Sequence, residues 1–147
     1  MTAMVKVHAA AGGLALARIA TFMTGSLVAE TGLGPDGIAA EKRGILWAIP
    51  LLVVALATAG ASGFRLGRGW RSPTGAAKQR RMPFIAANGL VVLVPAAVFL
   101  AARAEAGAFD GAFYLVQAVE IVAGAINIAL LGLNFRDGLK LARRGRA

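Results

Sequence analysis

The residues of this chain that could take part in chemistry are few, and most of them lie inside long apolar stretches. Arg18 and Glu120 are the two charged residues among them. A charge at the centre of a bilayer costs about 2.5–3.5 kcal/mol on insertion scales, so such groups face inward and pair. At about 1.5 Å of rise per residue, the arginine side chain can cover the difference in depth between them. We therefore predict an Arg18–Glu120 ion pair.

A stripe of polar residues accompanies Glu120 at helical spacing. Its members are Gln117, Glu120, Gly124, Asn127 and Asn134. Asn88, in another apolar stretch, comes to about the depth of Asn127, and we predict that the two amides bond to each other. One interpretation is that this polar seam specifies which helix lies beside which. The other is a binding or proton-conducting site, because buried ionisable groups in membranes often mark pathways.

His8 is the single histidine, and it begins an apolar stretch. A neutral imidazole there can bind haem iron, while Lys6, Arg81 or Lys140 can meet the propionates. The second axial ligand would come from another chain or from a methionine. The candidate methionines are Met4, Met23 and Met82. Haem b is thus the cofactor hypothesis, and an interfacial polar histidine is the alternative.

The composition excludes several classes of site. The chain has no cysteine, which excludes disulfides, thiolate metal sites and thiol nucleophiles. One histidine excludes a multi-histidine metal site within one chain. The sequence contains no phosphate-binding glycine loop and no evident nucleophile partner for His8. We therefore predict no catalytic residues.

The elements that must position these residues are apolar helices. Of the 147 residues, 58% are hydrophobic, and crossing a bilayer takes roughly 20 apolar residues in a helix. Four stretches qualify: 7–29, 44–64, 83–102 and 113–135. Arg18 interrupts the first, which argues for a retained helix rather than a cleaved signal peptide. The prediction is an all-α integral membrane protein, a single transmembrane domain over 1–147 folded as a four-helix up-down bundle.

The charges predict the orientation of this bundle. The connection 65–82 carries six basic residues and no acidic one, and the tail 136–147 carries five basic residues against Asp137 alone. Lys- and Arg-rich short segments stay in the cytoplasm, so both termini are predicted there, in a bacterial inner membrane. The net charge of +9 then indicates anionic lipid headgroups rather than nucleic acid. Trp70 either anchors the basic connection on the headgroups or belongs to a solvated linker.

Small residues and prolines add two open questions. Small residues recur at helical spacing along three of the spans, where they can pack within the chain or between chains. They are Ala11, Ala15, Ser26 and Ala29 in the first span, Ala55, Ala59 and Gly63 in the second, and Ala125 and Ala129 in the fourth. Pro50 and Pro95 lie at similar depths and are either ordinary kinks or the interruptions of a transporter site.

Two stretches carry a resemblance to known proteins. They are 78–90, read as KQRRMPFIAANGL, and 113–138, which ends in LLGLNFRDG. The chain resembles a family of small bacterial four-span transmembrane proteins without an assigned activity. More loosely, a histidine opening the first of four spans is similar to the cytochrome b561 and copper-resistance membrane families. The further haem-binding histidines of cytochrome b561 proteins have no counterpart in this sequence.

Three functional hypotheses follow. The first is a non-enzymatic accessory or assembly partner, or a homo-oligomer, built around the seam of Arg18, Asn88, Glu120 and Asn127. The second is a b-type haem or quinone redox protein that uses His8. The third is a small carrier or proton relay that works through Arg18 and Glu120.

Overall fold

In the computed structural model, residues 3–67 and 73–144 are described, with side chains as far as residue 141, and every regular element in these ranges is helical. The elements are α1 (Ala3–Gly32), α2 (Pro35–Gly67), α3 (Pro73–Ala87), the π-helix η1 (Asn88–Leu93), α4 (Val94–Glu105) and α5 (Gly111–Arg144). The predicted all-α class is confirmed. Trp70, for which a headgroup anchor and a solvated linker were the two interpretations, lies outside the described residues, as do Arg68, Arg71 and Arg146.

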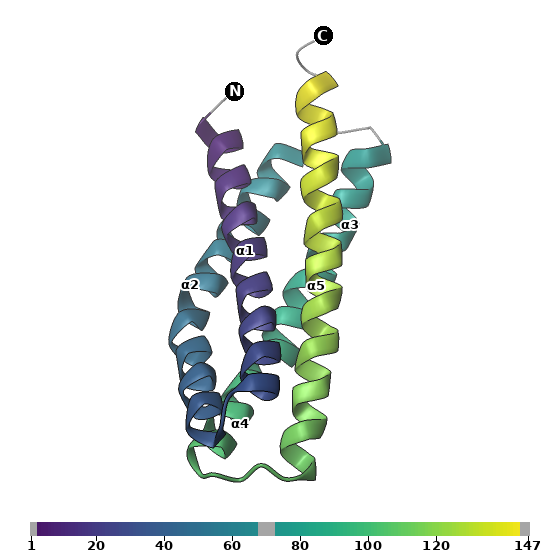
Figure 1. The fold of residues 1–147 in the computed structure, drawn as a ribbon. Coiled ribbons are helices and arrows are strands. Elements are labelled where there is room, and N and C mark those ends of the chain that lie inside the picture. Colours follow the sequence, from purple (N-terminus) through teal and green to yellow (C-terminus); the bar gives the residue numbers. More distant parts are fainter. Residues whose placement is uncertain (1–2, 68–72, 145–147) are drawn as a thin grey trace.

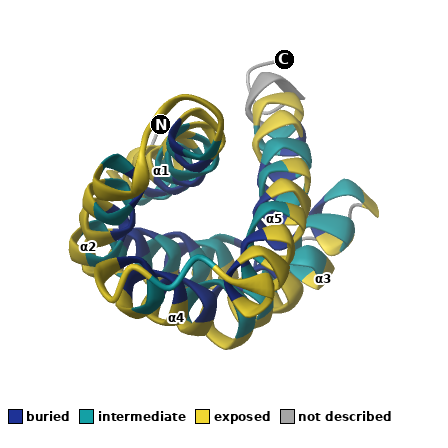
Figure 2. Cartoon of the chain, turned by 60° about the horizontal axis from the view of Figure 1, so that its bottom comes forward, coloured by how far each residue is buried: buried dark blue, intermediate teal, exposed yellow. Residues whose placement is uncertain are grey.

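The helices alternate in direction, so that both termini lie at one end of the molecule (Figure 1). We call this the terminal end, and the opposite end, where α1 meets α2 and α4 meets α5, the loop end. Both α1 and α4 contact α2 and α5. Figure 2 shows the resulting arc of helices, with exposed residues on its outer side. This arrangement is compatible with the predicted four-helix bundle.

Four helical rods are long and apolar enough to cross a membrane: α1, α2, the continuous run Pro73–Glu105, and α5 as far as Leu141. Each is longer than the span predicted from hydrophobicity. One such difference is at the start of α2, because only Leu33 and Gly34 separate it from α1. Pro35 opens α2 with a backbone angle already suited to a helix. The charged segment 36–43, predicted as a loop, is therefore helical.

The run Pro73–Glu105 changes its winding in the middle. At η1 the N–H of Val94 bonds to the carbonyl of Gly89, five residues earlier. Pro95 follows directly, and a proline ring clashes with the carbonyl four residues before it in a regular α-helix. The wide turn accommodates this ring. Pro50, by contrast, lies inside an unbroken α2 on its exposed side.

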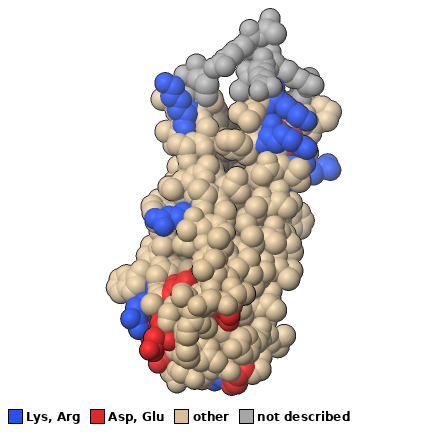
Figure 3. Space-filling view, in the orientation of Figure 1, with Lys and Arg blue, Asp and Glu red and all other residues tan. Residues whose placement is uncertain are grey.

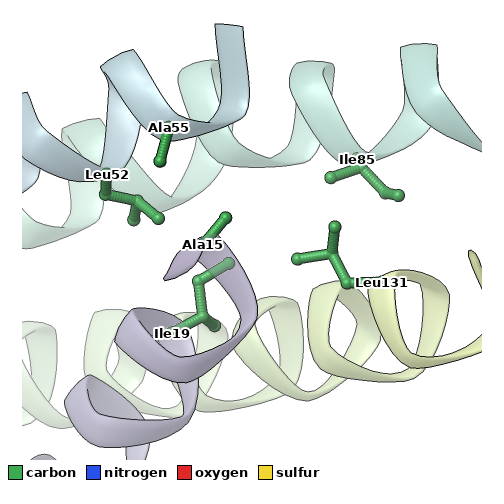
Figure 4. Close-up of a cluster of buried hydrophobic side chains, with 6 residues drawn as sticks. All are labelled: Ala15, Ile19, Leu52, Ala55, Ile85 and Leu131. Atoms are coloured by element: carbon green, nitrogen blue, oxygen red, sulfur yellow. The ribbon is translucent and has the colours of Figure 1, made fainter. Parts of the chain in front are cut away.

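The helices pack through two apolar clusters. The central one joins all four rods through Ala15, Ile19, Leu52, Ala55, Ile85 and Leu131 (Figure 4). The second lies toward the loop end and contains Ala29, Ile38, Leu100, Ala104 and Phe113. Of the predicted small-residue stripes, those of α1 and α2 pack inside the chain, whereas Ala125 and Ala129 of α5 are exposed. The α5 pair therefore does not take part in packing within the chain.

A polar cap begins α5. Asp110 accepts a hydrogen bond from the N–H of Phe113 at 3.1 Å and pairs with Arg103. The guanidinium of Arg103 and this backbone N–H lower the pKa of the Asp110 carboxyl. The cap sets where α5 starts, and so the height at which its polar stripe meets the other helices.

Candidate functional site

The polar stripe of α5 faces the interior as predicted. Gln117, Asn127 and Asn134 are buried, and Asn127 is fully so. Asn88 of η1 donates to Asn127 Oδ1 at 2.9 Å and to the carbonyl of Ala123 at 2.8 Å. The predicted bond between the two amides is confirmed, and it fastens the π-helix to α5.

Glu120 is paired, but not with Arg18. Its Oε2 accepts from Lys42 Nζ at 3.1 Å and from Gln117 Nε2 at 3.2 Å. Arg18 forms no ion pair with any residue that the structure describes. The predicted Arg18–Glu120 pair is therefore wrong. Ser26, a neighbour of this site on α1, lies eight residues beyond Arg18, which is about 12 Å along a helix.

Lys42 is the residue of this polar site that the sequence did not predict. Its side chain is 1% exposed, although it lies outside the predicted span 44–64. The signal was its spacing: Ile38, Lys42 and Ile45 follow one another at four and three residues and all are buried. Because α2 begins at Pro35, this face of the helix carries Lys42 into the bundle at the level of Glu120.

Further polar groups surround this lysine. Lys42 also donates to Ser26 Oγ at 2.9 Å and lies 3.5 Å from Glu41 Oε2. Ser26 donates in turn to Glu41 Oε1 at 3.1 Å. Glu30 is within electrostatic reach of both Lys42 and Glu120. We call these groups the Lys42 cluster: Ser26, Glu30, Glu41, Lys42, Gln117 and Glu120.

The Lys42 cluster contains more acceptors than donors. Three of its buried oxygens make no hydrogen bond: Glu30 Oε1, Glu41 Oε2 and Gln117 Oε1. Three carboxyl groups, those of Glu30, Glu41 and Glu120, also surround a single amine, that of Lys42. Buried polar groups are normally hydrogen-bonded, so this shortage of donors sets the cluster apart from the rest of the interior.

An apolar cavity of about 470 Å³ adjoins the cluster. All four rods contribute to its wall, which includes Phe22, Leu52, Leu56 and Ile85. Its polar lining residues are Ser26 and Glu120 at the Lys42 cluster, and Asn127 nearer the middle of α5. The cavity therefore joins a large apolar volume to one charged group.

The cavity opens sideways, between α2 and the middle of the Pro73–Glu105 run. The exposed residues of its lining all belong to these two elements: Ala57, Ala61, Phe64, Pro83, Ala86 and Leu90. The wide turn η1 contributes Gly89, Leu90 and Leu93 to the same wall. The rim is thus an apolar surface of α2 and the Pro73–Glu105 run.

His8 belongs to a separate site near the terminal end. Lys78 Nζ lies 2.9 Å from its Nε2, and the carbonyl of Ala59 lies 3.0 Å from its Nδ1. An ammonium group only donates, so Nε2 is the acceptor and Nδ1 carries the proton. Both ring nitrogens are engaged, and an iron ligand would have to replace Lys78 or Ala59. Haem binding stays a prediction.

Two further residues named for the haem hypothesis connect α3 to α5 beside this site. Arg81 pairs with Asp137 at 2.7 Å and bonds to Asn134 at 3.3 Å, while Asn134 donates to the sulfur of Met82 at 3.3 Å. Met23, by contrast, lines the large cavity. The adjoining space, lined by His8, Lys78 and Asn134 among others, holds about 140 Å³, below the roughly 300 Å³ at which ligand pockets usually begin.

Among the described residues, no group of three or more His, Asp or Glu side chains is placed to hold a metal ion. The Lys42 cluster and the cavity beside it are therefore the candidate site. Comparison of the chain with models of protein families, with curated proteins and with solved structures finds no match.

Proposed function

We propose that this chain is a multi-pass protein of the bacterial inner membrane that binds, and carries, a lipid-soluble small molecule in its central cavity. The observation that carries the proposal is the cavity itself: about 470 Å³, walled by four apolar rods and open on their side. Ligand pockets of drug-sized molecules span roughly 300–1,000 Å³ and are mostly apolar with a few polar groups. A molecule dissolved in the bilayer would reach this opening directly.

Of the three hypotheses drawn from the sequence, this proposal corresponds to the small carrier. Lys42 replaces Arg18 as the cationic partner of Glu120. Charge supports the membrane setting. Lys and Arg gather at the terminal end on the face seen in Figure 3, and acidic residues lie nearer the loop end. Under the positive-inside rule this asymmetry favours termini in the cytoplasm.

The test is binding of a neutral apolar fluorophore, N-phenyl-1-naphthylamine, to the protein purified in detergent. Gly60 lines the cavity, and a Cβ added there would lie 3.8 Å from Met82 Cε. We expect Gly60→Leu, which puts a side chain into the cavity, to weaken fluorophore binding at least tenfold. Gly132→Leu is the matched control, because a Cβ at Gly132 meets nothing within 4 Å. Equal binding by both variants would exclude the cavity as the site.

A second candidate function, the homo-oligomer or assembly partner, is favoured by the exposure of Ala125 and Ala129 on α5. Small residues on a membrane helix let another helix approach closely. Cross-linking through cysteines placed at these two positions, in membranes, would test it: absence of a dimer band at both would argue against this face as an interface.

A further inference from the structure

We propose that the molecule bound in the cavity is a lipophilic cation, with its positive group held by Glu120. This inference rests on the proposed function and specifies its ligand. Glu120 is the only ionisable residue among the described residues that line the cavity. The side chain of Glu120 is 13% exposed. Because it both bonds to Lys42 and lines the cavity, it stands at the boundary between the Lys42 cluster and the apolar space.

The first argument is charge. Glu120 has a cationic partner in Lys42, but that ammonium also serves Glu41 at 3.5 Å and lies within electrostatic reach of Glu30. The nearest other cation of α2, Arg43, is engaged at the surface by Glu105 at 2.8 Å. Glu120 therefore shares its cationic partner with another carboxyl group, and its own carboxylate lies at the cavity wall. In a medium of low dielectric constant, such a charge attracts a cation strongly and repels an anion.

The second argument is hydrogen bonding. The buried oxygens without a hydrogen bond, on Glu30, Glu41 and Gln117, include Glu41 Oε2, which has only the 3.5 Å ion-pair contact to Lys42, and Gln117 is itself bonded to Glu120. Gln117 is 4% exposed, so bulk water does not satisfy it. An organic ammonium group bound at Glu120 would bring positive charge and hydrogen-bond donors to the edge of this acceptor-rich cluster. A quinone or another carbonyl compound offers acceptors only, and a carboxylate or phosphate would add to both shortages.

The third argument is the shape of the cavity. Beyond Glu120 and Ser26, its wall is apolar except for Asn127, as far as the rim at Phe64 and Leu90. A small hydrated cation such as Na⁺ would leave this volume unused. A cation with a bulky apolar body would fill it, and Phe22 and Phe64 are aromatic residues of its lining.

The experiment compares two probes of the same size and opposite charge. Tetraphenylphosphonium and tetraphenylborate are titrated separately into the detergent-purified protein, with protein-free micelles subtracted, and N-phenyl-1-naphthylamine serves as the neutral probe. We expect the phosphonium to bind at least tenfold more tightly than the borate. If the neutral probe binds but the phosphonium has no advantage over the borate, this inference is overturned while the cavity function stands. If none of the three binds, the proposed function falls and this inference with it.

A series of charge-neutralising variants locates the effect. Glu120→Gln should weaken phosphonium binding at least tenfold. Glu41→Gln, which removes a carboxylate outside the cavity wall, should weaken it less, and Glu105→Gln, on the surface beside Arg43, should leave it unchanged. Binding of the neutral probe should be the same in all three, which also reports that each variant folds. Unchanged phosphonium affinity in folded Glu120→Gln would overturn the assignment of Glu120.

Discussion

The ammonium of Lys42 occupies the least hydrated position of any charge in the bundle described by the structure, at 1% exposure. Two neighbours bond to it directly, Ser26 at 2.9 Å and Glu120 at 3.1 Å. Taking an ion out of water costs several kcal/mol of free energy, and only well-placed charged or hydrogen-bonding partners offset that cost. Lys42 therefore acts as the positive centre on which one residue of α1 and one of α5 converge.

This position predicts the cost of removing the lysine. Lys42→Met leaves buried carboxylates without a counter-ion, and breaking a buried pair costs about 3–5 kcal/mol. Arg43→Met is the matched control in the next position of the chain, because its side chain is 55% exposed and exposed pairs contribute about 0–1 kcal/mol. The free energy of unfolding, measured by denaturant titration in detergent micelles, should separate the two variants clearly. A loss for Lys42→Met no larger than for Arg43→Met would contradict the role given to Lys42.

Single residues also explain how much of the site the sequence could reveal. Asn88 and Asn127 were paired correctly because each stands inside a predicted span, where its depth can be estimated from the sequence. Lys42 was missed because it stands in a charged run, Glu41–Arg43, where hydrophobicity indicates a loop. The Arg18–Glu120 prediction failed for a related reason. The nearer cation, Lys42, lies on the first turns of α2, which precede the predicted span 44–64, so a comparison of depths between predicted spans does not include it.

At the scale of elements, the π-helix η1 brings Gly89 against two neighbouring helices. A Cβ at Gly89 would lie 3.7 Å from Leu56 Cδ1 of α2 and 3.8 Å from Asn127 Nδ2 of α5. The absence of a side chain here lets the wide turn approach both helices while Leu90 and Leu93 line the cavity. π-Helical turns occur frequently at functional sites, and this one forms a wall of the proposed site.

The same geometry predicts a graded effect of side-chain size at Gly89. Gly89→Ala makes only ordinary van der Waals contacts and should be tolerated. Gly89→Leu overpacks the junction and should cost about 1–3 kcal/mol in the free energy of unfolding. Gly132→Leu, in open space on α5, should change the unfolding midpoint little. Equal midpoints for the two leucine variants would show that η1 does not approach α2 and α5 this closely.

The sequence contains only part of the information about these elements. Pro95 indicates an irregularity, but whether it becomes a kink or a wide turn depends on tertiary contacts such as the bond from Asn88 to the carbonyl of Ala123. The predicted start of α2, residue 44, differs from the observed start, Pro35, for another reason. A span predicted from hydrophobicity ends where charged residues begin, even when the helix continues through them. The composition was enough to predict that four apolar helices exist. The bounds of the helices and the cavity could not be predicted, because they depend on how side chains from four rods pack together.

At the scale of the whole molecule, the two ends differ in charge. Arg65, Lys78, Arg80, Arg81, Arg136 and Lys140 belong to the helix ends at the terminal end, whereas Asp36, Glu105 and Asp110 belong to the loop end. A bundle with this asymmetry should insert in one orientation only, because translocating a basic segment is unfavourable. In the proposed orientation, the Lys42 cluster lies toward the outer side of the membrane and the His8–Lys78 contact toward the cytoplasm.

That orientation gives a prediction for reporter fusions in a bacterial host. Alkaline phosphatase, which is active only outside the cytoplasm, should be active when fused after Gly107, between α4 and α5, and inactive when fused after Ala147. A green fluorescent protein at Ala147 should be fluorescent. Replacing Arg80, Arg81 and Lys78 by glutamine weakens the cytoplasmic signal and should raise phosphatase activity at Ala147, whereas the same change at Arg103 should not. High phosphatase activity at Ala147 in the unaltered chain would reverse the orientation, and would put the Lys42 cluster toward the cytoplasm.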